Sequence, residues 1–164
     1  METLYFTKIN EVRKERLELE RKLFVKISLV GKKVTIEGEA FQEYEARLVL
    51  EAMQFGFSAK KALLLKSEDF IFRRLPIKNF TRRKDLSVVR GRVIGKEGKT
   101  RSALENITGC EIIVKDDAVG LIGSAEGIEE ATTALTNLIR GSKQSNIYRF
   151  LERMNTARKE LRNE

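Results

Sequence analysis

Apolar and polar residues alternate with two different periods along this chain, and each change of period marks a predicted element. Over residues 99–141, KTRSALENI has a helical pattern, and two short β-rich runs, EIIVKD and AVGLIGS, follow with a turn between them. EGIEEATTALTNLIRG then spaces its apolar residues as a helix does and ends at Gly141. The pattern predicts helix, strand, strand and helix.

The same order is predicted for residues 9–56, from the stretches INEVRKERLELERKL, VKISLV, KVTIEG and FQEYEARLVLEAMQFG. When this part is laid on the later one without gaps, identical residues coincide with the apolar rhythm. The identities include Ile9 with Ile94, Leu19 with Leu104, Gly38 with Gly123 and Gly56 with Gly141. One unit therefore occurs twice.

Segments outside the repeat make the two copies unequal. FIFRRL and TRRKDLSVVRG predict a strand and a short helix ahead of the second copy, whereas only positions 1–8 precede the first, which is expected to lack both. A further helix is predicted after each copy, in SAKKALLLK and in SNIYRFLERMNTARKELR. The apolar stripe of the last helix favours packing on the chain's own core over binding a partner; it consists of Ile147, Phe150, Leu151 and Met154.

These patterns predict an α+β fold with two tandem units. Residues 1–68 are expected to form a degenerate, truncated unit (helix, strand, strand, helix), residues 69–144 a complete unit, and residues 145–164 a C-terminal helix. With 164 residues and 41% apolar content, the chain can fill a modest core.

Composition narrows the possible chemistry. The chain has one cysteine and no histidine, so it offers no internal disulfide, no zinc cluster and no histidine base. It also has no apolar run long enough to span a membrane and no signal-peptide pattern, so a cytoplasmic protein is expected. Asp116 and Asp117 are the only adjacent carboxylates of the second unit, and they fit a solvated hairpin turn. Neither catalysis, a metal nor a cofactor is expected.

The positive charge of the chain is concentrated in one segment. From Arg73 to Arg101 there are eleven Lys and Arg residues against two acids, so the segment carries +9, while the whole chain carries +8. A basic run is most often a solvated face, but this concentration favours a polyanionic partner.

Two glycines stand three apart within the basic segment, in VIGKEGKT. Gly95 and Gly98 are expected to lie in a turn between a short helix ending near Arg90 and a helix beginning near Lys99. Glycine allows a phosphate to approach the backbone amides, and the following helix adds its positive N-terminal end. Such a pair is usually only a turn, so the surrounding sequence decides the interpretation.

GRVIGKEGKTRSALENITGCEIIV resembles the KH-domain signature, in which an Ile-Ile-Gly-x-x-Gly run is followed by a helix, a Thr-Gly and a β-strand. The resemblance implies a type I KH arrangement over about residues 69–141. In KH domains the glycine loop clamps the backbone of about four unpaired nucleotides, and the bases lie in an adjoining apolar groove.

The resemblance implies an RNA-binding role for thirteen residues. The clamp is Gly95, Lys96, Glu97 and Gly98; the groove is lined by Val93, Ile94 and Leu104, with whichever of Ile112 and Ile113 faces inward; phosphates are within reach of Arg90, Arg92, Lys99 and Arg101. Glu97 opposes phosphate, so it implies a weaker or more selective clamp than two lysines would give. In the alternative interpretation, without RNA binding, the aliphatic residues belong to the core and the charged residues are only solvated.

The first copy departs from the signature. Asn10-Glu11-Val12-Arg13 stands where the glycine loop would be. Side chains at both former glycine positions block close backbone approach, so the first copy is not expected to grip RNA by this route.

Taken together, the tandem units, GRVIGKEGKTR, GFSAKKAL and YRFLERM closely resemble the archaeal members of the partner-of-Nob-one (Dim two) family of ribosome-assembly proteins. The resemblance implies a single-stranded RNA-binding protein that acts near the 3′ end of small-subunit ribosomal RNA. It also implies as partners the Nob one endonuclease and the alpha subunit of initiation factor two. A monomer is expected.

Two alternatives remain open. The chain could be a protein-interaction scaffold whose KH fold binds little RNA, which the degenerate first copy and Glu97 favour. It could also be a translation-linked RNA-binding adaptor.

Overall fold

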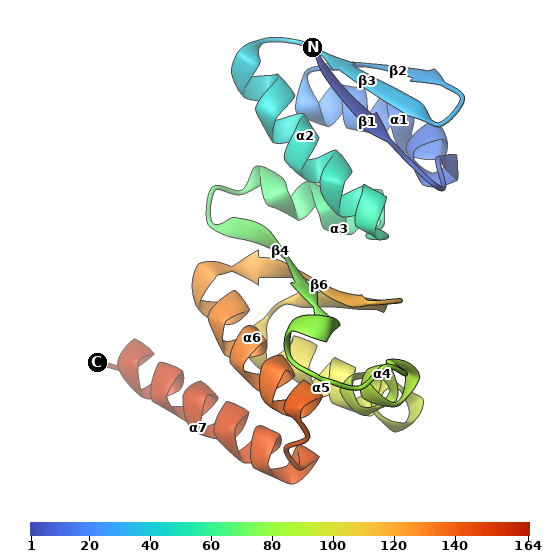
Figure 1. Cartoon of the computed structure of the whole chain (residues 1–164). Helices are drawn as coiled ribbons and strands as arrows, with labels where there is room; N and C mark the ends of the chain where they lie inside the picture. Colours follow the sequence, from blue (N-terminus) through green and yellow to red (C-terminus); the bar gives the residue numbers. More distant parts are fainter. The chain divides into compact units, whose positions relative to one another are not determined.

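The computed structural model describes residues 1–164, which divide into two compact units, Met1–Phe72 and Arg73–Glu164 (Figure 1). Each unit combines helices with a small three-stranded sheet. The predicted α+β class is therefore confirmed. No helix is both long and apolar enough to cross a membrane.

The first unit is built from one sheet and the helices that cover it. Its elements are β1 (Glu2–Tyr5), α1 (Asn10–Leu23), β2 (Lys26–Val30), β3 (Lys33–Glu37), α2 (Ala40–Phe55), α3 (Ala59–Ala62) and the 3-10 helix η1 (Leu63–Lys66). The strands lie in the order β1-β3-β2, with β3 antiparallel to both neighbours. Val34 and Ile36, on one face of β3, are fully buried.

The expectation that the first unit lacks an opening strand is wrong. Strand β1 pairs with β3 from Glu2 opposite Ile36 to Tyr5 opposite Lys33. An alignment of the two copies without gaps would place this strand inside helix α4 of the second unit (Ser87–Ile94). The strand was missed because only positions 6–9 separate β1 from α1, whereas positions 77–98 separate the corresponding elements of the second unit.

The second unit, whose first strand spans the boundary between the units, has a counterpart of each strand and of α1 and α2, and adds a helix and a loop between its first strand and the counterpart of α1. Its elements are β4 (Phe70–Pro76), the 3-10 helix η2 (Ile77–Asn79), α4 (Ser87–Ile94), the 3-10 turn η3 (Lys96–Gly98), α5 (Lys99–Thr108), β5 (Glu111–Lys115), β6 (Ala118–Ser124), α6 (Ala125–Arg140) and α7 (Gln144–Arg162). The strand order is β4-β6-β5, so the last strand of each sheet occupies the centre in both units.

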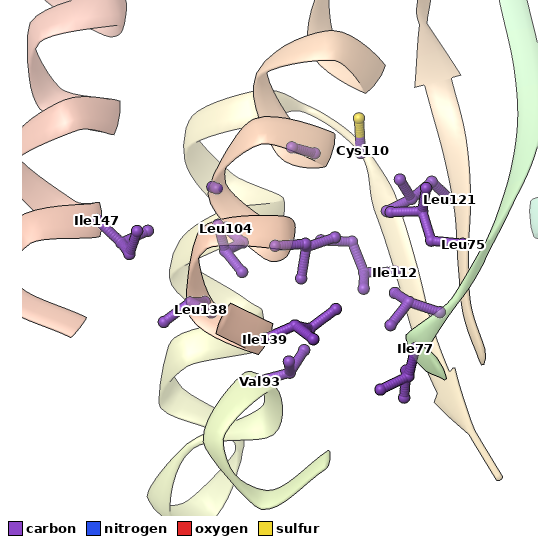
Figure 2. Packing of buried hydrophobic residues seen from close by; sticks show 14 of the residues in the cluster. Leu75, Ile77, Val93, Leu104, Cys110, Ile112, Leu121, Leu138, Ile139 and Ile147 are labelled. Atoms are coloured by element: carbon purple, nitrogen blue, oxygen red, sulfur yellow. The ribbon is translucent and has the colours of Figure 1, made fainter. Parts of the chain in front are cut away.

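The core of the second unit lies between this sheet and its helices (Figure 2). Ile112 of β5 pairs with Leu121 of β6, and both side chains are buried against residues of α5 and α6 such as Leu104 and Leu138. Because successive side chains of a strand point to opposite faces, this register fixes which residues of β5 face the helices.

Helix α7 packs on the chain's own core, as its apolar stripe predicts. Ile147 and Leu151 are buried in the core cluster, and Phe150 packs against it partly exposed. Met154, the fourth residue of the stripe, is 36% exposed. The second half of the helix therefore needs another anchor.

A buried ion pair supplies that anchor. The Arg158 guanidinium pairs with Glu130 of α6, whose side chain is 5% exposed, and also donates to the carbonyl of Ile107 at the end of α5. The pKa of Glu130 is raised above its ordinary value by burial, although the nearby Arg158 acts in the opposite direction. The carboxylate thus depends on this cation to stay charged inside the protein.

We expect Arg158→Ala to lower the free energy of unfolding by about 2–3 kcal/mol at neutral pH, because it leaves a buried carboxylate unpaired. A carboxyl whose folded-state pKa is raised binds its proton more tightly when folded, so its stabilising contribution is present below the unfolded pKa and is lost as pH rises through the folded pKa. Removing Arg158 raises the Glu130 pKa further. The deficit should therefore shrink as the pH falls towards the ordinary Glu pKa of about 4.3. Urea unfolding at acidic and neutral pH measures it.

The matched control is Arg153→Ala, because Arg153 is exposed on the same helix. An equal loss in both variants, or a loss that does not change with pH, would contradict the role of the buried pair.

Candidate nucleic-acid interface

The glycine loop connects α4 to α5 through backbone conformations that side chains disfavour. Gly95 has φ 75° and ψ 173°, and Gly98 has φ 75° and ψ 13°. Glu97 also has a positive φ of 57°, which costs a non-glycine residue roughly 1–2 kcal/mol. The loop is therefore held in shape by its surroundings rather than by local preference.

Gly95 is required by the protein itself. A β-carbon built on Gly95 would lie 2.7 Å from the Cβ of Thr100 and 2.8 Å from its amide nitrogen. Thr100 is in the first turn of α5 and is 2% exposed. The first glycine thus allows the end of α4 to pack directly against the start of α5.

Gly98 and the middle of the loop face outward. A β-carbon on Gly98 would approach no heavy atom closer than Nη2 of Arg101, at 3.9 Å, and the side chains of Lys96 and Glu97 are exposed. No side chain caps α5 at Gly98, so the first-turn amides of this helix lack a side-chain acceptor. The Lys99 amide donates to the carbonyl of Lys96, so it is the positive end of the helix, together with the exposed lysines, that suits this site to a phosphate.

Two of the predicted basic residues are free for such a ligand. Lys96 and Lys99 are exposed and form no ion pair. Arg101 instead lies 3.8 Å from the carboxylate of Glu105, so its charge is partly balanced. The cationic part of the loop is therefore small.

Arg90 and Arg92 contact the protein. The Arg90 guanidinium donates to the carbonyl of Asp116 in the β5–β6 turn, at 2.6 Å. The Arg92 guanidinium donates to the carbonyl of Leu138 at 3.4 Å. Both residues fix α4 to neighbouring elements, and each has an accessible portion left.

Most of the aliphatic residues expected to line a groove lie in the core. Val93 and Leu104 are 0% exposed, and Ile112 is 3% exposed (Figure 2). Of the two isoleucines, Ile112 is the one that faces the helices. Ile113, which pairs with Gly120 of β6, points to the other face of the sheet. Among these residues, Ile94 alone has surface beside the loop.

The structure reveals an apolar strip that sequence reasoning missed. Val88, Gly91 and Ile94 follow at intervals of three on the outer face of α4, and we call them the α4 strip. Val88 is 51% exposed, and Gly91 is exposed with no atom within 4 Å of a built β-carbon. Glycine inside a helix costs about 1 kcal/mol relative to alanine, and no atom lies close enough to Gly91 to require the absence of its side chain.

Val114 was missed as well, like Val88 and Gly91 of the α4 strip, whereas Ile94 was predicted. Val114 stands two residues after Ile112 on the same face of β5 and packs partly exposed against the core. The alternation of the strand was the signal that could have found it. The spacing of 88, 91 and 94 was the corresponding signal for the α4 strip.

Comparison with known proteins agrees with this geometry. A family model for the second KH domain of PNO1, described as a eukaryotic-type KH domain (KH-domain type I), matches residues 71–156. A KH domain-containing protein of Methanocaldococcus jannaschii is 34% identical over 143 residues, which cover 82% of this chain and 63% of the relative. The pre-rRNA-processing protein pno1 of Emericella nidulans is 28% identical over 153 residues, 89% of this chain and 58% of the relative.

A solved structure is similar over nearly the whole chain. The complex of a/eIF2alpha, aDim2p and rRNA from Pyrococcus horikoshii matches with a TM-score of 0.84 and 27% identity, covering 95% of this chain and 94% of that one. The chain spans about six tenths of the length of the two curated relatives described above.

Fold, loop and family model together define a type I KH-domain protein. Within that class, the chain belongs to the PNO1/Dim2 family, the partner-of-Nob-one proteins.

The two loop glycines should respond differently to alanine. Gly95→Ala combines a backbone region that is nearly glycine-only with overlap against Thr100, so we expect a loss of about 3 kcal/mol or more in the free energy of unfolding. Gly98→Ala adds only an ordinary contact with the end of the Arg101 side chain and should cost about 1 kcal/mol for its left-handed conformation. Urea unfolding of both variants measures the difference, and equal losses would contradict the packing role of Gly95.

Proposed function

We propose that this chain binds single-stranded RNA, namely small-subunit ribosomal RNA near its 3′ end, and acts in small-subunit assembly without catalysing a reaction. The observation that carries the proposal is the outward-facing loop Lys96–Gly98 at the uncapped start of α5. The relatives add support, because one is named a pre-rRNA-processing protein and a solved complex of aDim2p contains rRNA.

The geometry supports a division between phosphate and base contacts. A phosphate at the start of α5 is attracted by the positive end of the helix and by the exposed Lys96 and Lys99. Bases of the same strand can then lie on the α4 strip, whose exposed apolar surface has no partner of its own. Unpaired bases suit this arrangement because their faces are free to pack on aliphatic groups.

Glu97 limits the strength of this clamp. Its carboxylate is exposed in the middle of the loop and repels phosphate, so the loop residues 95–98 carry no net charge. Affinity must then depend on the positive end of α5, on Lys99 and on base packing more than on the charge of the loop.

We propose that the first unit is a KH-like unit without an RNA clamp. Its sheet has the same strand order as the second, but α1 begins at Asn10, soon after β1 ends at Tyr5, so there is no room for the extra helix and loop. It contains 13 basic and 12 acidic residues, a net charge of +1, against 19 and 12, or +7, for the second unit. A bracing or protein-facing role fits this nearly neutral unit.

We also propose that the chain contacts the alpha subunit of initiation factor two, because aDim2p occurs in a solved complex with a/eIF2alpha. Contact with the Nob one endonuclease rests on the family resemblance alone. We propose that the protein acts as a monomer in the cytoplasm.

A protein-interaction scaffold with little RNA binding is the second candidate. The observation that favours it is the weak charge of the loop, where Glu97 offsets Lys96. The two candidates differ in whether the loop sets RNA affinity.

The test is Lys96→Asp in a binding assay with single-stranded RNA from the 3′ end of small-subunit rRNA. With an RNA of about four nucleotides, the wild type should neutralise three or four phosphates, giving a slope of roughly −2 to −3 in log affinity against log salt. The variant should bind at least about tenfold more weakly, with a shallower slope, because it loses one cation and gains an anion beside a phosphate.

Lys32→Asp is the matched control, since Lys32 is an exposed lysine in the β2–β3 turn of the first unit. Equal binding by Lys96→Asp and the wild type would favour the scaffold. Indifference to single-stranded or duplex RNA would rule out the clamp.

A further inference from the structure

An exposed basic segment lies at the end of α4 that is remote from the glycine loop. It consists of Arg82, Arg83 and Lys84, which directly precede the helix and are all exposed. None of the three forms an ion pair. Like charges placed side by side without acidic partners repel one another, and an anionic ligand relieves that repulsion.

The one nearby carboxylate is already engaged. Asp85 is the only acidic residue between positions 78 and 94. It accepts hydrogen bonds from the Ser87 amide at 3.0 Å and the Ser87 hydroxyl at 2.6 Å, and these bonds lower the pKa of Asp85. The carboxylate is therefore tied to the start of α4 and is not bonded to the basic side chains.

The α4 strip connects this segment to the loop. Helix α4 has eight residues, which corresponds to about 12 Å along its axis. Val88 lies in its first turn, next to the basic segment, and Ile94 lies beside Gly95. A strand that leaves the loop along the strip therefore arrives at Arg82, Arg83 and Lys84.

We infer that the basic segment is a second phosphate-binding site, which contacts the RNA strand beyond the nucleotides held by the loop. The inference rests on the proposed function and deepens it. It extends the bound length past the roughly four nucleotides that a KH loop clamps. Along α4 the cations Arg90 and Arg92 are half-buried and each donates to a backbone carbonyl, so the basic segment offers the next fully exposed cations.

The experiment compares a short and a long single strand. The triple variant Arg82→Gln, Arg83→Gln, Lys84→Gln is measured against the wild type with an RNA of about four nucleotides and one of about twelve from the 3′ end of small-subunit rRNA. We expect unchanged binding of the short RNA. Binding of the long RNA should weaken on the order of tenfold, and its salt slope should become shallower by about 2, since three cations are lost.

The control carries the same loss of charge elsewhere. Lys26→Gln, Lys32→Gln, Lys33→Gln removes three exposed lysines of the first unit and should leave both affinities near those of the wild type. Equal loss in the control, or no loss for the long RNA in the first variant, would overturn the second site. If the wild type binds neither RNA, the proposed function itself fails.

Two hydrogen bonds connect helix α7 to the helices on either side of the loop. The Tyr148 hydroxyl donates to Oγ1 of Thr100 at 3.3 Å, and Thr100 is the residue that packs against Gly95. The Gln144 side chain donates from Nε2 to the carbonyl of Arg92 at 3.2 Å. The start of α7 thus contacts both helices that flank the loop.

We further propose that Tyr148 is a positioning residue for the RNA clamp. By holding the Thr100 side chain, its hydroxyl keeps the start of α5 against Gly95 and the first-turn amides in place. The proposal rests on the proposed function. Replacing Tyr148 should change RNA affinity without changing its salt dependence, because Tyr148 brings no charge to the phosphate.

Tyr148→Phe should weaken binding of the short RNA several-fold while its salt slope stays that of the wild type, and thermal unfolding should shift by less than about 2 °C. Lys96→Asp, in contrast, changes the slope. Tyr44→Phe, at an exposed tyrosine of the first unit, is the control. Unchanged affinity in Tyr148→Phe, or an affinity loss explained by the unfolded fraction, would contradict the role of Tyr148.

Discussion

The contact between Gly95 and Thr100 is the constraint on which the interface of the second unit depends. It is possible only because Gly95 lacks a side chain, and it joins the end of α4 to the first turn of α5. Once the two helices meet this closely, the chain between them must turn outward. Exposure of Lys96, the positive φ of Glu97 and the open side of Gly98 follow from this packing.

The same packing explains why the aliphatic residues of the motif divide into two groups. Val93, Leu104 and Ile112 hold α4, α5 and β5 together inside the core. Ile94 is adjacent to Val93 but lies about 100° around the helix, so it reaches the surface with Gly91 and Val88. One motif thus supplies both the support of the interface and its exposed apolar part.

Sequence reasoning found most of the second unit because its elements are long and regular. The alternation of strands and the longer period of helices identified β5, β6, α5 and α6, and the apolar stripe of α7 placed that helix on the core. Strand β1 was missed because a repeat search without gaps cannot detect a strand displaced by a deletion.

At the site, the motif predicted the position of the loop but not which of the neighbouring side chains are exposed. Whether Val93 or Val88 faces solvent depends on how α4 is rotated against the core, and Arg90 and Arg92 turned out to contact carbonyls of Asp116 and Leu138. These contacts join segments far apart in the sequence, which no local pattern specifies. Burial of Thr100 beneath Gly95 is likewise a tertiary contact.

The first unit provides an internal comparison that separates what the fold needs from what the site needs. It forms a sheet of the same strand order with helices α1 and α2, although positions 6–9 stand where the second unit has positions 77–98, with α4 and the loop. A stable unit of this topology therefore does not require that longer segment.

The second unit nevertheless retains three features there that cost stability: a glycine inside α4, a non-glycine residue at positive φ, and an exposed valine. The first unit also has a positive φ at Phe24 and an exposed valine, Val30, so it is the combination of these features with the exposed, unpaired lysines of the loop that points to a ligand. The excess of positive charge in the second unit indicates that this ligand is a polyanion.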